Sequence, residues 1–286
     1  MRLRAEFALL GVTVIWGASF VIIKAVLADI SPLLFLALRF LLATLALAII
    51  YRKKVRRAGI WAGMLAGGLL FAGFVLQTEG LKLTTPSKSA FLTGLSIPMI
   101  PFANWLVYRL RPKKVEVSGI LIASSGMVLM TLPSGRFAMS AGDLLTLLCA
   151  VAFALYFIVI SHFAPIFGFE TLTVIQIAFA AALGVVSALA FGPAYFHATP
   201  SLAAGILAMG LLATALAFSV LTWAQRYTTA ARSAVILALE PALAWFTSYL
   251  VTGEILSNRG KMGAGLILAG ILLVELKRSK PETLNI

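Results

Sequence analysis

The feature that most constrains this chain is a series of long apolar segments separated by short polar loops. A helix that crosses the hydrocarbon core of a bilayer needs about 20 mostly apolar residues. The chain carries ten such segments, at 6–27, 33–51, 59–80, 88–108, 116–132, 142–161, 169–191, 201–224, 231–252 and 261–276. The sequence therefore predicts an all-α polytopic membrane protein with ten transmembrane helices.

The composition agrees with this prediction and excludes other classes of protein. Hydrophobic residues make up 61% of the 286 and charged residues 12%, whereas a soluble domain has about 45–50% and about 25%. A soluble enzyme, a disordered chain and a disulfide scaffold are thereby excluded. The first segment resembles a signal peptide but is too long for one and is followed by no cleavage motif, so we expect it to be retained as a helix.

The distribution of Lys and Arg predicts the orientation in the membrane, because these residues concentrate in cytoplasmic loops. With a cytoplasmic N-terminus, the inner side would hold 16 of the 23 cations and the outer side six, while Arg39 lies within a segment. We therefore expect both termini in the cytoplasm. The expected location is the inner (plasma) membrane of a bacterium.

The chain also contains an internal repeat. The stretch 84–90, Thr-Thr-Pro-Ser-Lys-Ser-Ala, recurs at 228–234 as Thr-Thr-Ala-Ala-Arg-Ser-Ala. Further matched positions are Glu6 with Asp143, Arg39 with Gln176, Pro98 with Pro241, Gly119 with Gly263 and Gly126 with Gly270. The predicted repeats are 1–135 and 136–286, each with five spans. Since five is odd, the second repeat would be inverted relative to the first, an architecture typical of secondary transporters. A duplication without functional meaning is the alternative.

Several motifs resemble the EamA-type branch of the drug/metabolite transporter superfamily. They are Trp16 to Phe20, Pro32 to Phe40, Glu240-Pro241, Gly253-Glu254, Gly263 and the run 267–270. The first half departs from the pattern: Ile97 precedes its proline, and Arg109-Leu110-Arg111 stands where Gly-Glu would be expected. The resemblance implies a substrate-translocating protein of the amino-acid and metabolite exporter branch, although some members move nucleotide sugars or cations.

Ionisable groups inside a bilayer are costly, so each is a candidate functional residue. Glu240 is predicted near the membrane midplane, where it could bind a substrate ammonium group or take up a coupling proton. Alternatively, it could hydrogen-bond backbone groups freed by Pro241. Arg39 could pair with a substrate carboxylate, extend outward to the interface, or neutralise Asp29.

Three further sets of residues complete the candidate site. A cavity for a small amphipathic solute would combine a few polar groups with aromatic ones, and its additional candidates are Trp16, Ser19, Gln77, Thr78, Ser89, Thr93, Tyr156 and Ser233. An outer vestibule would hold Lys24, Glu79, Lys82 and Lys88, unless these only mark a wet interface. Pro98, Pro101 and Pro241 could let their helices bend during gating.

The leading functional prediction is a secondary transporter that exports small metabolites, foremost amino acids, by alternating access around a central cavity between the repeats. The alternatives are a transporter of sugar phosphates, nucleotide sugars or cationic drugs, and a membrane scaffold that transports nothing. The sequence carries no phosphate-binding loop, HExxH, CxxC or nucleophile elbow, so no enzyme, cofactor, metal or nucleic acid is expected. The expected partners are the small-molecule substrate, the lipid bilayer and a coupling proton.

Overall fold

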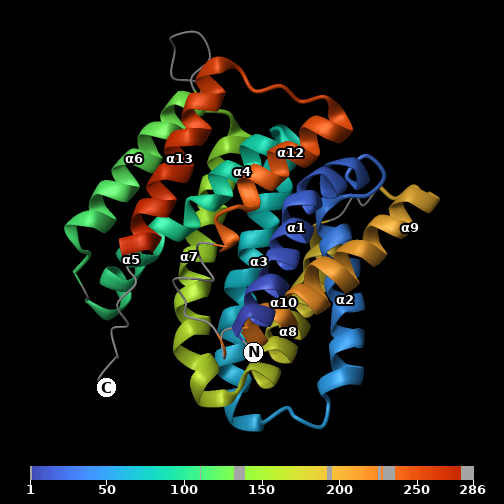
Figure 1. Ribbon diagram of the computed structural model, residues 1–286. Coiled ribbons are helices and arrows are strands. Elements are labelled where there is room, and N and C mark those ends of the chain that lie inside the picture. The colour runs from blue at the N-terminus through green and yellow to red at the C-terminus, as the bar shows by residue number, and fades with distance from the viewer. Residues whose placement is uncertain are drawn as a thin grey trace.

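The computed structural model describes residues 2–109, 111–131, 139–191, 195–224, 227 and 236–277. Throughout these residues the chain forms a bundle of helices (Figure 1), with one isolated β-bridge between Ile30 and Phe196. The helices are α1 (Arg2–Val26), α2 (Pro32–Tyr51), η1 (Arg57–Gly59), α3 (Ile60–Leu83), α4 (Pro86–Gly94), α5 (Ser96–Tyr108), α6 (Lys114–Thr131), α7 (Ala141–Phe167), α8 (Phe169–Phe191), α9 (Pro200–Leu207), η2 (Ala208–Leu216), α10 (Ala217–Ala224), α12 (Glu240–Thr252) and α13 (Asn258–Lys277).

All ten predicted segments are helical over most of their described residues, and turns occupy Leu27, Leu95 and residues 238–239. Seven helical stretches of the described residues are long and apolar enough to cross a membrane. The three other segments are covered by α6, α12 and α13, and the residues 231–235 of the ninth lie outside the described part. The prediction of an all-helical membrane protein is therefore confirmed.

The fourth and ninth segments are not continuous helices. The fourth divides at Leu95 into α4 and α5, and α12 begins at Glu240 directly after a turn at 238–239. In each case a proline, Pro98 or Pro241, follows the break by a few residues. Proline lacks a backbone N–H and its ring clashes with the carbonyl four residues earlier, which weakens the helix there. The predicted span over 88–108 is thus one candidate membrane span, Pro86–Tyr108, built from two helices rather than one.

The eighth segment contains a π-helix, η2, between α9 and α10. Within it the hydroxyl of Thr214 donates to the carbonyl of Met209, five residues earlier, at 2.8 Å. Gly210 lets this stretch approach α2 closely, because a Cβ there would lie 3.1 Å from the carbonyl oxygen of Arg39. Such π-helical turns occur frequently at functional sites.

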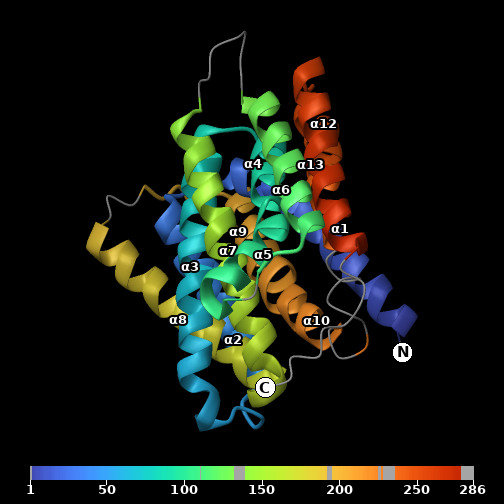
Figure 2. The same cartoon turned by 90° about the vertical axis from the view of Figure 1, so that its left-hand side faces the viewer.

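The fifth and tenth predicted spans, α6 and α13, lie side by side and antiparallel (Figures 1 and 2). A Cβ on Gly126 would come within 2.5 Å of the Gly263 carbonyl oxygen, and one on Gly270 within 2.5 Å of the Gly119 carbonyl oxygen. The two backbones therefore touch at glycines, as small residues permit in membranes. Because the sequence matches Gly119 with Gly263 and Gly126 with Gly270, the second contact repeats the first with matched residues exchanged.

Most of the remaining helices pack against one another around a shared core. α2 packs on α8, α3 on α7 and α8, and α1 on α10 and α12. Glycines again permit close approach: a Cβ on Gly67 would lie 2.5 Å from the Gln176 carbonyl oxygen, and one on Gly17 would lie 2.8 Å from the Leu243 Cβ. Residues from α1, α2, α3, α7, α8 and α10 consequently share one hydrophobic core.

Candidate functional site

Arg39 of α2 lies in the middle of this core with 1% of its surface exposed. Its Nε donates to the hydroxyl of Thr214 in η2 at 2.8 Å. Its guanidinium lies over the Phe74 ring, 4.4 Å from the centroid. Its Nη1 is buried and has no hydrogen-bond partner. Arg39 therefore does not extend outward, and Asp29 accepts instead from Thr199 at 2.8 Å.

Trp16 of α1 binds the residue next to Thr214. Its Nε1 donates to the carbonyl of Ala213 at 2.9 Å, and its ring centroid lies 5.4 Å from that of Phe218. The π-helix η2 therefore accepts hydrogen bonds from α1 and α2 at two consecutive residues, Ala213 and Thr214. Ser19, by contrast, donates to the Trp16 carbonyl of its own helix at 2.6 Å.

Two further polar side chains reach the same region from α7 and α8. Tyr156 is 2% exposed, and its ring centroid lies 6.4 Å from that of Phe218. Gln176 is fully buried, and its side-chain amide lies close to the Tyr156 hydroxyl. We name Trp16, Arg39, Tyr156 and Gln176 the central site.

An aromatic frame connects the members of the central site. The ring centroids of Phe74 and Phe218 lie 6.4 Å apart, so these two rings join the side of Arg39 to the side of Trp16 and Tyr156. Prediction from the sequence missed Phe74, Phe218, Thr214 and the site role of Gln176. The available signals were a threonine in the middle of an apolar span and the repeat match of Gln176 with Arg39. The two phenylalanines carried no signal.

A second polar group lies where α3, α4, α7 and α12 meet. Gln77 donates to the Thr93 hydroxyl at 3.4 Å, and the Cys149 thiol lies close to Thr93 and Glu240. Glu240 is half-buried in the first turn of α12, directly after the helix break. Thr78 and Ser89 are buried nearby in the chain, and their hydroxyls have no partner. Ser233 lies outside the described residues.

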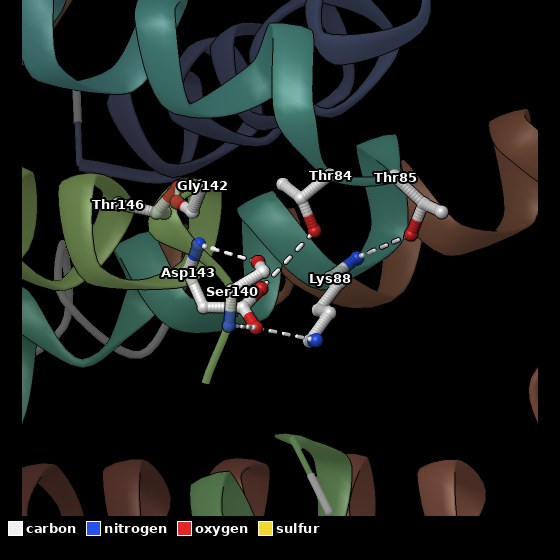
Figure 3. A network of polar contacts seen from close by, with 7 residues as sticks. All are labelled: Thr84, Thr85, Lys88, Ser140, Gly142, Asp143 and Thr146. Atoms are coloured by element: carbon white, nitrogen blue, oxygen red, sulfur yellow. Dashed lines mark hydrogen bonds and ion pairs between the residues drawn. The ribbon is translucent and has the colours of Figure 1, made fainter. Parts of the chain in front are cut away.

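The predicted outer vestibule falls at the joint between α3 and α4. Lys88 forms an ion pair with Asp143 at the start of α7, with Nζ and Oδ2 2.7 Å apart, and Asp143 also accepts from Thr84 (Figure 3). Asp143 is 1% exposed and closes a capping box with Ser140. The pair therefore ties α4 to α7.

The other vestibule candidates lie along the end of α3. Lys24 donates to the carbonyls of Leu81, Lys82 and Thr84 at 2.7–2.9 Å, so it satisfies the last turn of that helix. Glu79 and Lys82 form an exposed pair at 3.8 Å. Lys24 and Lys88 thus lie where the end of α3 meets α4 and α7. Glu79 and Lys82 lie on the protein surface beside them.

The Gly253-Glu254 motif connects the end of α12 to the start of α4. Gly253 ends α12 with φ 69°, and the Glu254 carboxylate accepts from the Ser87 hydroxyl at 2.8 Å and from Ser248. In the first half, Arg109 ends α5 with φ 60°, the same left-handed position occupied by a non-glycine residue. Glu254 was not predicted as a site residue, although its motif was available.

Arg39 is buried at the centre of the bundle. One cavity of about 330 Å³ lies on the surface of α3, α5 and α7, another of about 510 Å³ lies beside the loop 53–56, and Arg39 lines neither of them. In this centre the Arg39 guanidinium is the cationic hydrogen-bond donor, and the rings of Phe74 and Phe218 form an apolar surface beside it.

Comparison with known proteins relates the chain to membrane transport. A model of the EamA-like transporter family matches residues 3–132 and 140–276. An uncharacterized transporter of Archaeoglobus fulgidus is 31% identical over 96% of this chain and 87% of its own length. YdfC of Bacillus subtilis, also an uncharacterized transporter, is 25% identical over 93% and 89%. The uncharacterized inner membrane transporter YedA of Escherichia coli is 24% identical over 94% and 90%. One solved crystal structure has a TM-score of 0.70 over 98% of this chain and all of that chain, at 20% identity.

Proposed function

This chain belongs to the EamA-like transporter family and is an integral membrane protein, and from that premise we propose that it exports small metabolites, foremost amino acids, by alternating access. The central site receives the substrate between two five-helix repeats. The relatives carry names of transporters, which agrees with a transporter rather than an enzyme.

The observation that carries the proposed substrate class is the state of Arg39. Its guanidinium is buried with an unpartnered Nη1, and among the described residues it forms no ion pair. Burying an uncompensated charge is expensive, whereas a carboxylate can accept two parallel hydrogen bonds from a guanidinium. A substrate carboxylate at Arg39 would supply the missing partner, and the aromatic frame suits an apolar side chain on that substrate.

The small number of buried cations argues against a polyanionic substrate. Arg39 is the sole Lys or Arg among the buried residues of the described part of the chain. A sugar phosphate or a nucleotide sugar carries at least two negative charges, and several buried cations would be needed to compensate them. A zwitterionic substrate needs one cation for its carboxylate and one acceptor for its ammonium group.

Glu240 is our candidate for the second of these roles. It lies half-buried at the helix break, near Thr93 and Cys149. Acidic groups inside membrane bundles mark substrate and proton pathways, so Glu240 would bind the substrate ammonium group or a coupling proton. We also place the protein in the bacterial inner membrane with both termini inside, a location that the name of the YedA relative supports.

The helix breaks support the proposed movement. Discontinuous helices in corresponding positions of two halves are typical of transporters. Here the breaks in α4–α5 and before α12 also meet, because a Cβ on Gly94 would lie 3.0 Å from the Pro241 ring. Bending at Pro98, Pro101 and Pro241 would then move both halves together and expose the buried Arg39 to one side of the membrane at a time.

A solute screen in proteoliposomes tests this function. Purified protein is reconstituted, and efflux of labelled amino acids is measured with and without a pH gradient, with a sugar phosphate and empty liposomes as controls. We expect protein-dependent flux of amino acids and none of the sugar phosphate, and acceleration by the gradient if Glu240 carries a proton. Absence of flux for every amino acid would contradict the proposal.

A further inference from the structure

The loop between α2 and α3 carries five cations within residues 52–57 and is held in place by the corner between α7 and α8. The hydroxyl of Thr171 accepts from the Arg56 amide at 3.1 Å and donates to the Lys54 carbonyl at 3.5 Å. A Cβ on Gly59 would lie 2.9 Å from Phe167 and from Thr171, so η1 also presses on this corner. Figures 1 and 2 show loop and corner together at one end of the molecule. The cations are thus presented by a fixed backbone.

A cavity of about 510 Å³ lies between this loop and the corner. Its charged lining residues are Lys53, Lys54, Arg56 and Glu170. Lys54 lies 3.7 Å from Glu170, which compensates one cation. Lys53 and Arg56 are exposed, and the cavity retains an excess of positive charge at physiological pH. We name it the basic cavity.

Aromatic rings connect the basic cavity to a second, apolar one. Phe167 lines the basic cavity and Phe163 lines a cavity of about 330 Å³ one turn earlier on α7. These two rings are stacked with centroids 5.9 Å apart, and Trp61 lies 4.7 Å from Phe163 and 6.1 Å from Phe167. Trp61 is 55% exposed at the start of α3, and exposed tryptophans at helix ends mark the headgroup region of a bilayer.

The apolar cavity runs along the membrane-spanning surface. Leu65 and Leu69 of α3, Val107 and Tyr108 of α5, and Leu155, Ile158, Val159 and Phe163 of α7 line it. Leu65 and Val107 are 47% and 51% exposed, so the cavity opens outward rather than toward the central site. An exposed apolar groove of this kind, one helical turn below a cationic cavity, has the polarity profile of a phospholipid.

We propose that these two cavities together bind one anionic phospholipid of the bilayer. Its phosphate lies against Lys53 and Arg56, and one acyl chain follows the groove between α3, α5 and α7. Basic pockets beside membrane helices are suited to anionic headgroups. Phe163, Phe167 and Trp61 lie at the junction of headgroup and chain. The site is separate from the central site, so its failure would leave the proposed transport function untouched.

Lipid binding to the detergent-purified protein, measured by native mass spectrometry, tests the site. The lipids are dioleoyl phosphatidylglycerol and the zwitterionic dioleoyl phosphatidylcholine. The pair Lys53→Gln/Arg56→Gln should weaken phosphatidylglycerol binding about thirtyfold, because each cation near an anionic lipid contributes about 1 kcal/mol. The matched pair Arg52→Gln/Arg57→Gln removes the same charge from the same loop outside the cavity and should retain binding. Equal loss in both pairs means general attraction to the loop and overturns the site.

The groove is tested separately with Val107→Trp, because Val107 is exposed and lines the apolar cavity, and the indole ring would occupy space there. This variant should weaken phosphatidylglycerol binding although every cation remains. Inorganic phosphate at millimolar concentration is the probe for the competing source, and it should not displace the lipid. Displacement by phosphate together with unaltered binding to Val107→Trp would show an anion site without a lipid, and would overturn the proposal.

Discussion

Arg39 occupies a position at which the surrounding protein satisfies its hydrogen-bond donors only in part. One nitrogen bonds Thr214, the planar group rests on Phe74, and Nη1 has no partner. A structural arginine would be expected to use its full donor set when it is this deeply buried. The stability of an Arg39 variant measured without substrate therefore distinguishes a binding role of this residue from a packing role.

We expect Arg39→Gln to lower amino-acid exchange about 100-fold or more, since removing one partner of a buried ion pair costs roughly 3–5 kcal/mol. The thermal midpoint of the substrate-free variant should be unchanged or higher, because the empty site no longer holds an uncompensated charge. Arg39→Lys keeps the charge but loses the fork geometry, and should be intermediate. A large fall in the midpoint without a specific effect on exchange would identify Arg39 as a packing residue.

Arg109 offers a test of backbone strain. It ends α5 with φ 60°, where a non-glycine residue costs roughly 1–2 kcal/mol, and its counterpart is Gly253. Arg109→Gly should therefore raise the free energy of unfolding by up to about 1 kcal/mol, and Gly253→Ala should lower it. Thermal unfolding in detergent measures both, and a lower midpoint for Arg109→Gly would contradict this interpretation.

At this scale the sequence predicted the residues whose chemistry is unusual in a membrane. Trp16, Arg39 and Tyr156 were identified because polar tips in apolar spans are rare. Phe74 and Phe218 could not be identified, because a phenylalanine that frames a site has the same local pattern as one in the core. The choice among the three predicted roles of Arg39 required the fold, because the sequence does not show that α2 packs against Thr214.

Among the helices, α6 and α13 depend on glycine for their contact. A Cβ on Gly270 would lie 2.5 Å from the Gly119 carbonyl oxygen, whereas nothing lies within 4 Å of one on Gly265 of the same helix. We expect Gly270→Val to destabilise the protein by about 1–3 kcal/mol or more through overpacking. Gly265→Val has the same helix propensity and should be nearly neutral. Thermal midpoints in detergent measure both effects. An equal fall of the midpoint in Gly270→Val and Gly265→Val would contradict the close packing of α6 and α13.

The sequence predicted that the fourth and ninth segments would be weakened at prolines, but it did not predict the π-helix. Pro98 and Pro241 indicated weak points because proline removes a backbone donor. The break at Leu95 and the turn before Glu240 then had to be located by the structure. The stretch 208–216 is apolar and contains no proline, and its hydrophobic pattern does not distinguish a π-turn from an α-turn. The π-helical turn occurs where Gly210 packs closely against α2, and this contact is a property of the fold.

For the whole molecule, the inverted repeat stays a prediction with support from packing. The exchanged glycine contacts of α6 and α13 are what a two-fold axis between the halves would produce. The family model also matches the chain in two consecutive parts. Sequence matching could propose the halves, but only loop locations across a membrane can establish the inversion.

Cysteine labelling in intact cells tests the orientation. In a Cys149→Ser background, single cysteines replace Lys53 and Lys82, both of which are exposed. A membrane-impermeant maleimide should label Lys82→Cys from outside and Lys53→Cys only after the membrane is opened. Labelling of both from the same side would contradict the predicted topology.

The central claim is that the central site binds an amino-acid carboxylate at Arg39. Its most direct test is counterflow of labelled amino acids into proteoliposomes loaded with unlabelled amino acids, with competition by the corresponding amino-acid amides. The amides keep the ammonium group and the side chain but lack the carboxylate. We predict exchange by the wild type that amino acids inhibit and amides do not, and no exchange by Arg39→Gln. Equal inhibition by amides, or wild-type exchange by Arg39→Gln, would contradict the account.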